Sequence, residues 1–165
     1  RTLCVCGLAL VIALAVGVPT GIALGSRRFP GRGLLVTSVN AGMGAPPVVV
    51  GLLVALLLWR RGPFGGLGWM YSTKAMIAAQ VLIALPLVVG ITLAAVGAVG
   101  DEWHLQVETL GVPRRWRFWL LAREIRMGLL AAVIAALGGI LSEVGAVQMV
   151  GGNLAGETRV LSTAI

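Results

Sequence analysis

The sequence predicts an all-α protein, a polytopic bundle of transmembrane helices with about four to five spans, and three observations lead to this prediction. Hydrophobic residues make up 58% of the 165 residues and charged residues only 12%, about half the charged fraction of soluble domains. The apolar residues are gathered in runs of about 20 or more, the length that crosses a hydrocarbon core. The net charge is +7, and basic residues beside apolar spans mark the cytoplasmic side of a membrane, so we expect no nucleic-acid partner.

The first uncharged segment, from Thr2 to Ser26, is long enough to cross the membrane as one helix. Gly17, Gly21 and Gly25 recur at intervals of four residues, so they lie on one face of that helix. Small residues at this spacing let another helix approach closely. Pro19 falls among them and is expected to kink the helix. We therefore predict that this face packs against a neighbouring helix.

The second uncharged segment, from Gly33 to Trp59, is also long enough to cross, but it contains the adjacent prolines Pro46 and Pro47. Neither proline can donate a backbone hydrogen bond, so the helix must bend or break there. Broken backbone at membrane depth is tolerated only inside protein or along a water-filled cavity. Two alternatives follow for this segment, an element of a translocation path and a simple packing kink.

The third span is predicted from Ala75 to Gly100, after a glycine-rich outer loop in which Trp69 and Tyr71 are interfacial anchors. The fourth begins at Met127, and its apolar run continues past a single carboxylate to Val150. Gly151, Gly152 and Asn153 then form a predicted turn on the outer side. Four crossings place the two arginine-rich segments, residues 27–32 and 101–126, on the same side of the membrane. Arginine density assigns that side to the cytoplasm.

The segment from Asp101 to Arg126 gathers most of the polar chemistry of the chain. It contains five of the 13 basic residues, four of the 6 acidic residues and three of the 5 tryptophans. Gly111 followed by Pro113 predicts a break between two short helices. The second helix would offer aromatic side chains (Trp116, Phe118 and Trp119) to the apolar groove of a partner. A basic and aromatic helix lying on the membrane surface is the alternative.

The residues that enzymes use are nearly missing from this sequence. The only lysine is Lys74 and no nucleotide-binding loop of the form G-x-x-x-x-G-K-[ST] occurs. His104 is the only histidine and is interpreted as a solvated loop residue, and Cys4 and Cys6 as small hydrophobic residues of a membrane helix. We therefore predict no enzymatic activity, no metal site and no cofactor bound by this chain.

Residues 105–119 resemble the coupling loop of ABC-importer permeases, whose usual form is Glu-Ala-Ala-x-x-x-Gly followed by a basic and aromatic helix. Leu105, Gln106 and Val107 stand where Glu-Ala-Ala is expected, whereas Thr109, Leu110 and Gly111 follow the pattern. Four further segments resemble tungstate-type oxyanion permeases: residues 27–32, 43–51, 75–80 and 142–165. Molybdate and sulfate permeases carry a looser version of the last of these segments.

The resemblance implies a permease domain of the type I ABC-importer fold over residues 1–165, with further helices before and after it. It implies import of a tetrahedral oxyanion, first of all tungstate, with molybdate or sulfate as alternatives. The implied partners are a second copy in a homodimer, a cytoplasmic ABC ATPase dimer that binds the ATP and Mg²⁺, an extracytoplasmic oxyanion-binding protein and membrane lipid. The implied location is a prokaryotic plasma membrane. A non-transport structural membrane protein is the alternative from a different class.

Two sets of residues are expected to carry this function. The set for ATPase coupling is Glu108, Gly111, Pro113, Arg114, Arg115, Trp116, Phe118 and Trp119. The set for the translocation path or gate is Pro46, Pro47, Glu143, Gly151, Gly152 and Asn153. An intramembrane carboxylate is a functional candidate, but it repels an oxyanion, so Glu143 is expected to hold an outer gate by pairing with backbone donors or a nearby Arg. The glycines offer backbone N–H groups, although a plain turn is equally consistent with them.

Overall fold

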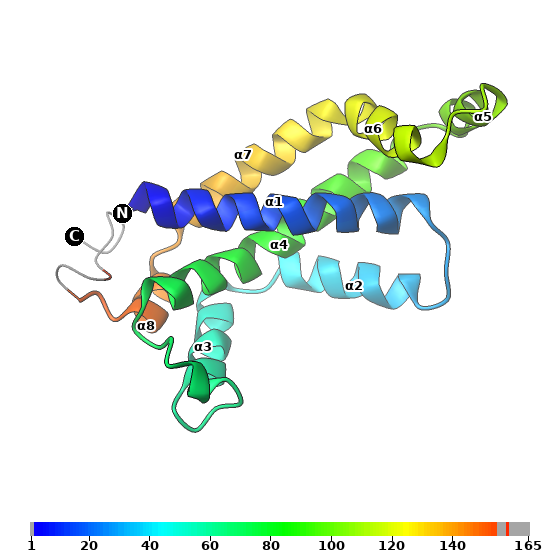
Figure 1. Cartoon of the computed structure of the whole chain (residues 1–165). Coiled ribbons are helices and arrows are strands. Elements are labelled where there is room, and N and C mark those ends of the chain that lie inside the picture. Colours follow the sequence, from blue (N-terminus) through cyan, green and yellow to red (C-terminus); the bar gives the residue numbers. More distant parts are fainter. Residues whose placement is uncertain (1, 155–157, 159–165) are drawn as a thin grey trace.

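The structure is a computed structural model that describes residues 2–154 and 158, and helices joined by short connections make up its architecture (Figure 1). No residue in this described part of the chain belongs to a β-strand, and the all-α prediction is confirmed. In chain order the elements are α1 (Thr2–Ser26), α2 (Arg32–Met43), α3 (Pro47–Leu58), the 3-10 helix η1 (Gly65–Leu67), α4 (Thr73–Gly97), α5 (Asp101–Thr109), α6 (Arg114–Glu124), α7 (Arg126–Ser142) and α8 (Gly145–Gly151).

The long helices α1 and α4 form the centre of the bundle and run in the same direction (Figure 1). Each has 25 residues and is apolar enough to cross a membrane. Each glycine of the predicted face packs closely against a side chain of α4, and a Cβ added to any of them would collide with it. The pairs follow the same order along both helices: Gly17 with Val88, Gly21 with Thr92 and Gly25 with Val96. The predicted close packing of this face is confirmed, and α1 continues as one helix through Pro19.

The second apolar segment does not cross as one straight helix. Helices α2 and α3 are bent by 106° at the predicted break. Pro46 caps α3 in an extended conformation and Pro47 is its first residue, a position where a proline costs no helical hydrogen bond. The bend carries α3 away from α2 and onto α8, where Gly51 lies against Ala146. The predicted break is thus confirmed, and the span becomes a broken or re-entrant pair.

The fourth apolar segment, predicted as an apolar run from Met127 to Val150, is also divided into two helices. Helix α7 ends at Ser142 and α8 begins at Gly145. Glu143 is extended, and its side chain accepts a hydrogen bond from the Ala146 N–H in the first turn of α8. At its other end α7 is bent by 70° from α6. The described helices therefore provide two spans, or up to four if each bent pair counts as one.

Both arginine-rich segments lie at one end of the molecule, as the span count predicts. The connection between α1 and α2 and the helices α5 and α6 share this arginine-rich end, whereas α3, η1 and α8 are at the opposite end (Figure 1). At the arginine-rich end Ile22, Val96, Leu121 and Ile125 form a buried cluster that joins α1, α4 and α6. This cluster fixes the charged helices to the bundle.

Candidate functional site

A tight turn separates α5 from α6 and sets the angle between them. Gly111 has a φ of 63°, a left-handed conformation that glycine adopts without steric cost. Its N–H donates to the Glu108 carbonyl at 3.0 Å, and the Val112 N–H donates to the Val107 carbonyl at 3.3 Å. Pro113 then caps α6 in an extended conformation. The helix break predicted at residues 111–113 is confirmed.

One face of α6 is anchored in the protein. Leu121 and Ile125 are each 4% exposed and pack against α1 and α4. At the start of the helix, the Arg117 Nε donates to the Val112 carbonyl at 2.8 Å and so ties α6 to the preceding turn. These contacts hold α6 in a defined orientation relative to the bundle.

The opposite face of α6 presents aromatic side chains to the outside. Trp116 and Trp119 are each 51% exposed. Phe118 is 47% exposed but lies toward the buried face, where it lines the same groove as Leu121. The two indole rings meet edge to face with centroids 6.2 Å apart, and the Arg123 guanidinium lies 5.6 Å from the Trp119 ring centroid. Exposed aromatic and Arg side chains on a fixed scaffold are typical of interface anchors.

The remaining coupling candidates lie around this aromatic face. Glu108 and Arg115 are exposed, and Arg114 opens the helix, although its side chain lies outside the described ones. Leu105, the first residue that departs from the usual loop pattern, is also exposed, whereas Val107 is buried and lines a pocket that residues of α6 also line. The structure therefore brings the predicted coupling residues together on one short helical hairpin.

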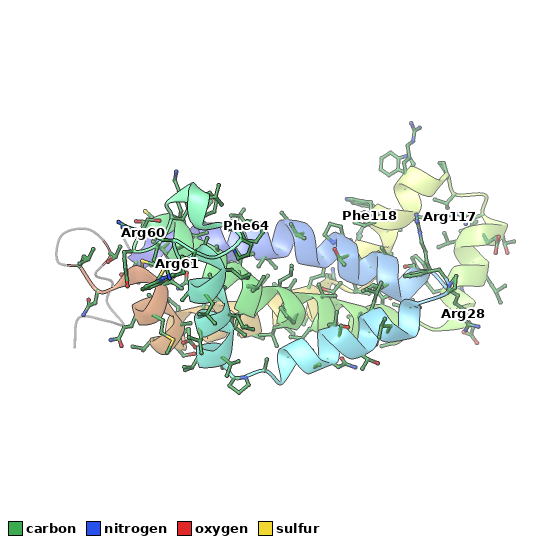
Figure 2. The ribbon with its side chains drawn as sticks, turned by 90° about the horizontal axis from the view of Figure 1, so that it is seen from below. Arg28, Arg60, Arg61, Phe64, Arg117 and Phe118 are labelled. Carbon is green, nitrogen blue, oxygen red and sulfur yellow. The ribbon has the colours of Figure 1, made fainter. Side chains whose placement is uncertain are left out.

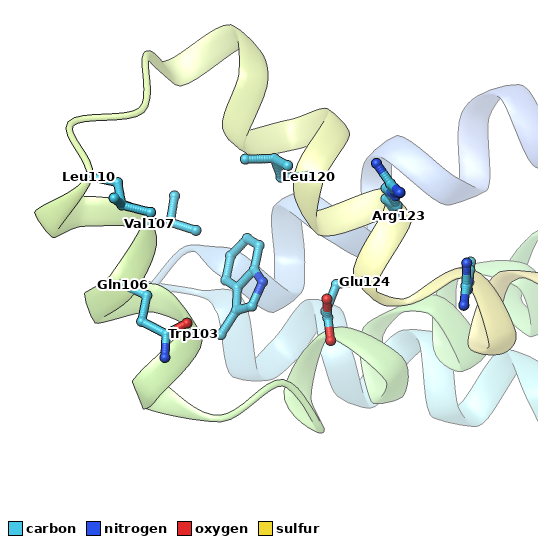
Figure 3. Close-up of a pocket in the computed structure, with 8 residues that line it drawn as sticks. Trp103, Gln106, Val107, Leu110, Leu120, Arg123 and Glu124 are labelled. Carbon is cyan, nitrogen blue, oxygen red and sulfur yellow. The ribbon is translucent and has the colours of Figure 1, made fainter.

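A pocket of about 510 Å³ separates the two helices of this hairpin (Figure 3). Trp103, Val107 and Leu120 provide its apolar walls, while Arg123 and Glu124 place charges of both signs at its edge. This pocket could not be predicted from the sequence, since it arises from the fold of α6 back over α5. Mixed charge and apolar walls suit contact with a protein side chain better than a bound anion.

Glu143 occupies the junction of α7 and α8. It is 8% exposed, and its Oε1 accepts a hydrogen bond of 2.7 Å from the Ala146 N–H. Of the two pairings considered for this carboxylate, the structure contains the one with a backbone donor. The carboxylate therefore satisfies one backbone donor in the first turn of α8, although the N-cap position itself is Val144.

The two broken segments meet at this junction. Gly145 lies so close to α3 that a Cβ on it would be 2.9 Å from the Val48 Cγ2. Pro47, which begins α3, immediately precedes Val48. The proline break and the Glu143 break, far apart in sequence, are therefore neighbours in space.

The predicted turn after α8 is present and uses the backbone groups of its glycines. Gly151 is buried, and the Gly152 N–H donates to the Gln148 carbonyl at 2.9 Å. Gly152 and Asn153 have φ values of 69° and 49°. The Gly152 donor is thus engaged inside the helix end, as in a plain turn, and is not presented outward.

Residues 17–164 match the family described as binding-protein-dependent transport system inner membrane component. The chain is 38% identical over 162 residues to the probable anion ABC transporter permease protein of Haloferax volcanii, covering 95% of this chain and 70% of that protein. It is 40% identical over 157 residues to the tungstate uptake system permease protein TupB of Peptoclostridium acidaminophilum, covering 95% and 69%. The molybdenum transport system permease protein ModB of Escherichia coli is 29% identical over 170 residues, covering 98% and 74%. Sulfate transport system permease proteins are also similar.

Proposed function

Because the chain belongs to the family of binding-protein-dependent transport system inner membrane components, and is thereby an ABC-importer permease for an anion, we propose that its cargo is tungstate. The 40% identity to a tungstate uptake permease supports this choice. Molybdate and sulfate are the alternative cargoes, since permeases named for both are similar to the chain. The family has no ATPase site of its own, so the energy must come from a partner subunit.

The α5–α6 hairpin is the proposed docking element for that ATPase. The observation that carries this proposal is the division of α6 into two faces: Leu121 and, directly after the helix, Ile125 are buried in the bundle, while Trp116 and Trp119 are half-exposed. A partner that moves the exposed face also moves α1 and α4 through the buried face. Motion also reaches α7 directly, because only Ile125 separates α6 from it. ATP and Mg²⁺ would be held by the ATPase and not by this chain.

The meeting point of the two broken segments is the proposed gate region. Helix α2 has 12 residues, about 18 Å at helical rise, and α7 has 17 residues, about 25 Å. Starting from the arginine-rich end, both breaks therefore fall in the distal half of a hydrocarbon core about 30 Å thick. Non-helical backbone at that depth suits a water-filled path. Glu143 would hold this region closed through its bond to Ala146.

The proposed orientation places the arginine-rich end in the cytoplasm and the end with α3 and α8 outside, where a binding protein would deliver the oxyanion. The proposed assembly is a homodimer of permease subunits with two ATPase subunits, surrounded by membrane lipid. Arginines at 27, 28 and 32 together with those of α6 support this orientation.

Uptake of labelled tungstate by cells with and without this subunit tests the proposed cargo. We expect uptake to depend on the subunit and to resist competition by excess sulfate more than competition by molybdate, which resembles tungstate more closely. Competition by sulfate equal to that by unlabelled tungstate would overturn the tungstate assignment. Uptake that does not require the subunit would overturn the transport function itself.

A further inference from the structure

Two grooves flank the last turns of α1 at the arginine-rich end. One, of about 760 Å³, lies between α1, α5 and α6. The other, of about 720 Å³, lies between α1 and the segment that follows it. Pro19, Ala23 and Arg27 line both grooves. The outer surface of α1 is therefore bordered on two sides by hollows that share one arginine.

Both grooves are cationic at one end. Arg117 joins Arg27 in the first groove, and Arg28 joins Arg27 in the second. No Asp or Glu is among the described residues that line either groove, in contrast to the pocket inside the α5–α6 hairpin, which Glu124 lines. Figure 2 shows Arg28 and Arg117 at the same end of the molecule, far from Arg60 and Arg61. The grooves are thus complementary to an anion.

Apart from one hydroxyl side chain in each (Ser26 in the first groove and Thr20 in the second), the rest of the grooves is apolar and reaches into the depth of the membrane. Pro19 is seven residues before Ser26, the end of α1, which corresponds to about 10 Å at helical rise. No charged residue occurs between Thr2 and Ser26, so Pro19, Ile22 and Ala23 belong to the hydrocarbon region. Phe118 covers the first groove from α6. Apolar walls do not favour the binding of a free oxyanion, and a cytoplasmic protein does not reach this depth.

We propose that these grooves bind an anionic phospholipid of the surrounding leaflet. Its phosphate lies beside Arg27, with Arg117 or Arg28 as the second cation, and an acyl chain lies along Pro19 and Ala23. A lipid in the first groove contacts α1 and α6 together, so it stabilises the orientation of the proposed docking helix. This inference rests on the proposed membrane orientation and is independent of which anion is transported.

Lipid retention by the full-length protein tests the proposal. The protein is placed in nanodiscs of phosphatidylcholine with one-fifth phosphatidylglycerol, extracted gently, and the retained lipids are counted by native mass spectrometry. We expect enrichment of phosphatidylglycerol over its share in the nanodisc. Arg27→Gln combined with Arg28→Gln should lower the retained ratio of phosphatidylglycerol to phosphatidylcholine by about five-fold per arginine, which corresponds to about 1 kcal/mol for each basic residue near an anionic leaflet. Enrichment that persists in this variant would overturn the proposal.

Two further variants separate a built site from general charge attraction. Ala23→Phe fills the apolar part of both grooves and keeps every arginine. Because Ala23 is exposed, the fold should tolerate the change. This variant should also lose the enrichment of phosphatidylglycerol. Arg60→Gln combined with Arg61→Gln removes the same amount of charge from the opposite end of the molecule (Figure 2). This variant should retain the enrichment of phosphatidylglycerol. An equal loss in this second pair would reveal attraction without a site.

A last arm distinguishes a lipid from a free anion at the same arginines. Excess inorganic phosphate or tungstate is added before extraction, and retained phosphatidylglycerol is counted again. We expect no displacement, because neither anion fills the apolar part of the grooves. Displacement by either would overturn the assignment to lipid. Since retention is measured without transport, a failure of the uptake experiment leaves this result unaffected.

Discussion

Gly21 of α1 lies so close to Thr92 of α4 that a Cβ on Gly21 would be 2.7 Å from the Cβ of Thr92. The same Cβ would be 2.9 Å from the Val89 carbonyl oxygen, which belongs to the backbone and cannot rotate away. Close approach of this kind takes the place of the hydrophobic effect for helices surrounded by lipid. The contact joins the two central helices near the arginine-rich end and thereby supports the docking hairpin.

Gly21→Val is expected to separate α1 from α4 and to lower the free energy of unfolding by about 1–3 kcal/mol, the usual cost of overpacking. The matched control is Gly7→Val in the same helix, where nothing lies within 4 Å of the new Cβ. Thermal unfolding of both purified variants in the same detergent measures the difference. Equal melting temperatures would mean that the α1–α4 contact is not as close as described.

Thr92→Val is expected to leave stability unchanged or to raise it by on the order of 1 kcal/mol. Thr92 is fully buried, and its hydroxyl has no hydrogen-bond partner among the described residues, so a methyl group of the same shape removes a desolvated polar atom. Thr92→Ala is the control, because it removes the methyl group that packs against Gly21 and should lower stability. A loss of stability in Thr92→Val would mean that the Thr92 hydroxyl makes a hydrogen bond.

Glu143→Leu is expected to lower the free energy of unfolding by about 1–3 kcal/mol, since the buried Ala146 N–H loses a charged acceptor. Glu143→Gln retains an acceptor oxygen and should keep most of that stability. In the gate hypothesis the charge itself contributes, so the Gln variant should change ATPase activity measured without substrate. Wild-type transport and wild-type coupling in Glu143→Gln would contradict the gate.

Trp116→Ala combined with Trp119→Ala is expected to weaken binding of the ATPase subunit by about tenfold or more, because aromatic anchors commonly contribute about 2 kcal/mol or more. Stability should be nearly unchanged, as both rings are half-exposed. Leu121→Ala, on the buried face of the same helix, should instead lower stability by about 2–5 kcal/mol. Normal ATPase binding by the double variant would favour a helix that lies on the membrane surface.

Gly111→Val is expected to disturb the angle between α5 and α6 and to reduce ATP-driven transport while the membrane helices stay folded. Gly111 has a φ of 63°, which costs other residues about 1–2 kcal/mol and a β-branched residue more. Gly100→Val at the other end of α5 is the control, because its φ of −65° and ψ of 157° suit valine and nothing lies within 4 Å of the new Cβ. Uptake assays and detergent solubility compare the two, and equal transport would remove the turn from the coupling mechanism.

Local chemistry accounts for the features that could be predicted from the sequence. The break at Pro46 and Pro47 follows from two missing backbone donors, and the turn at Gly111 follows from a glycine with a proline two residues after it. The division of the fourth apolar segment at Glu143 could not be predicted from the apolar run, because hydropathy reports whether a segment is apolar and not whether its backbone continues.

Composition and residue spacing are enough to predict a membrane protein of apolar helices, with both arginine-rich segments at one end and a small-residue face on α1 for close packing. They do not predict that α4 fills that face, that Leu121 is buried while the tryptophans of α6 are exposed, or that the Pro47 and Glu143 breaks meet. This difference follows from the range of the interactions. Hydropathy, charge and turn chemistry act within a few residues, whereas the choice of packing partner depends on side chains far apart in the chain that fit together only after the helices have formed.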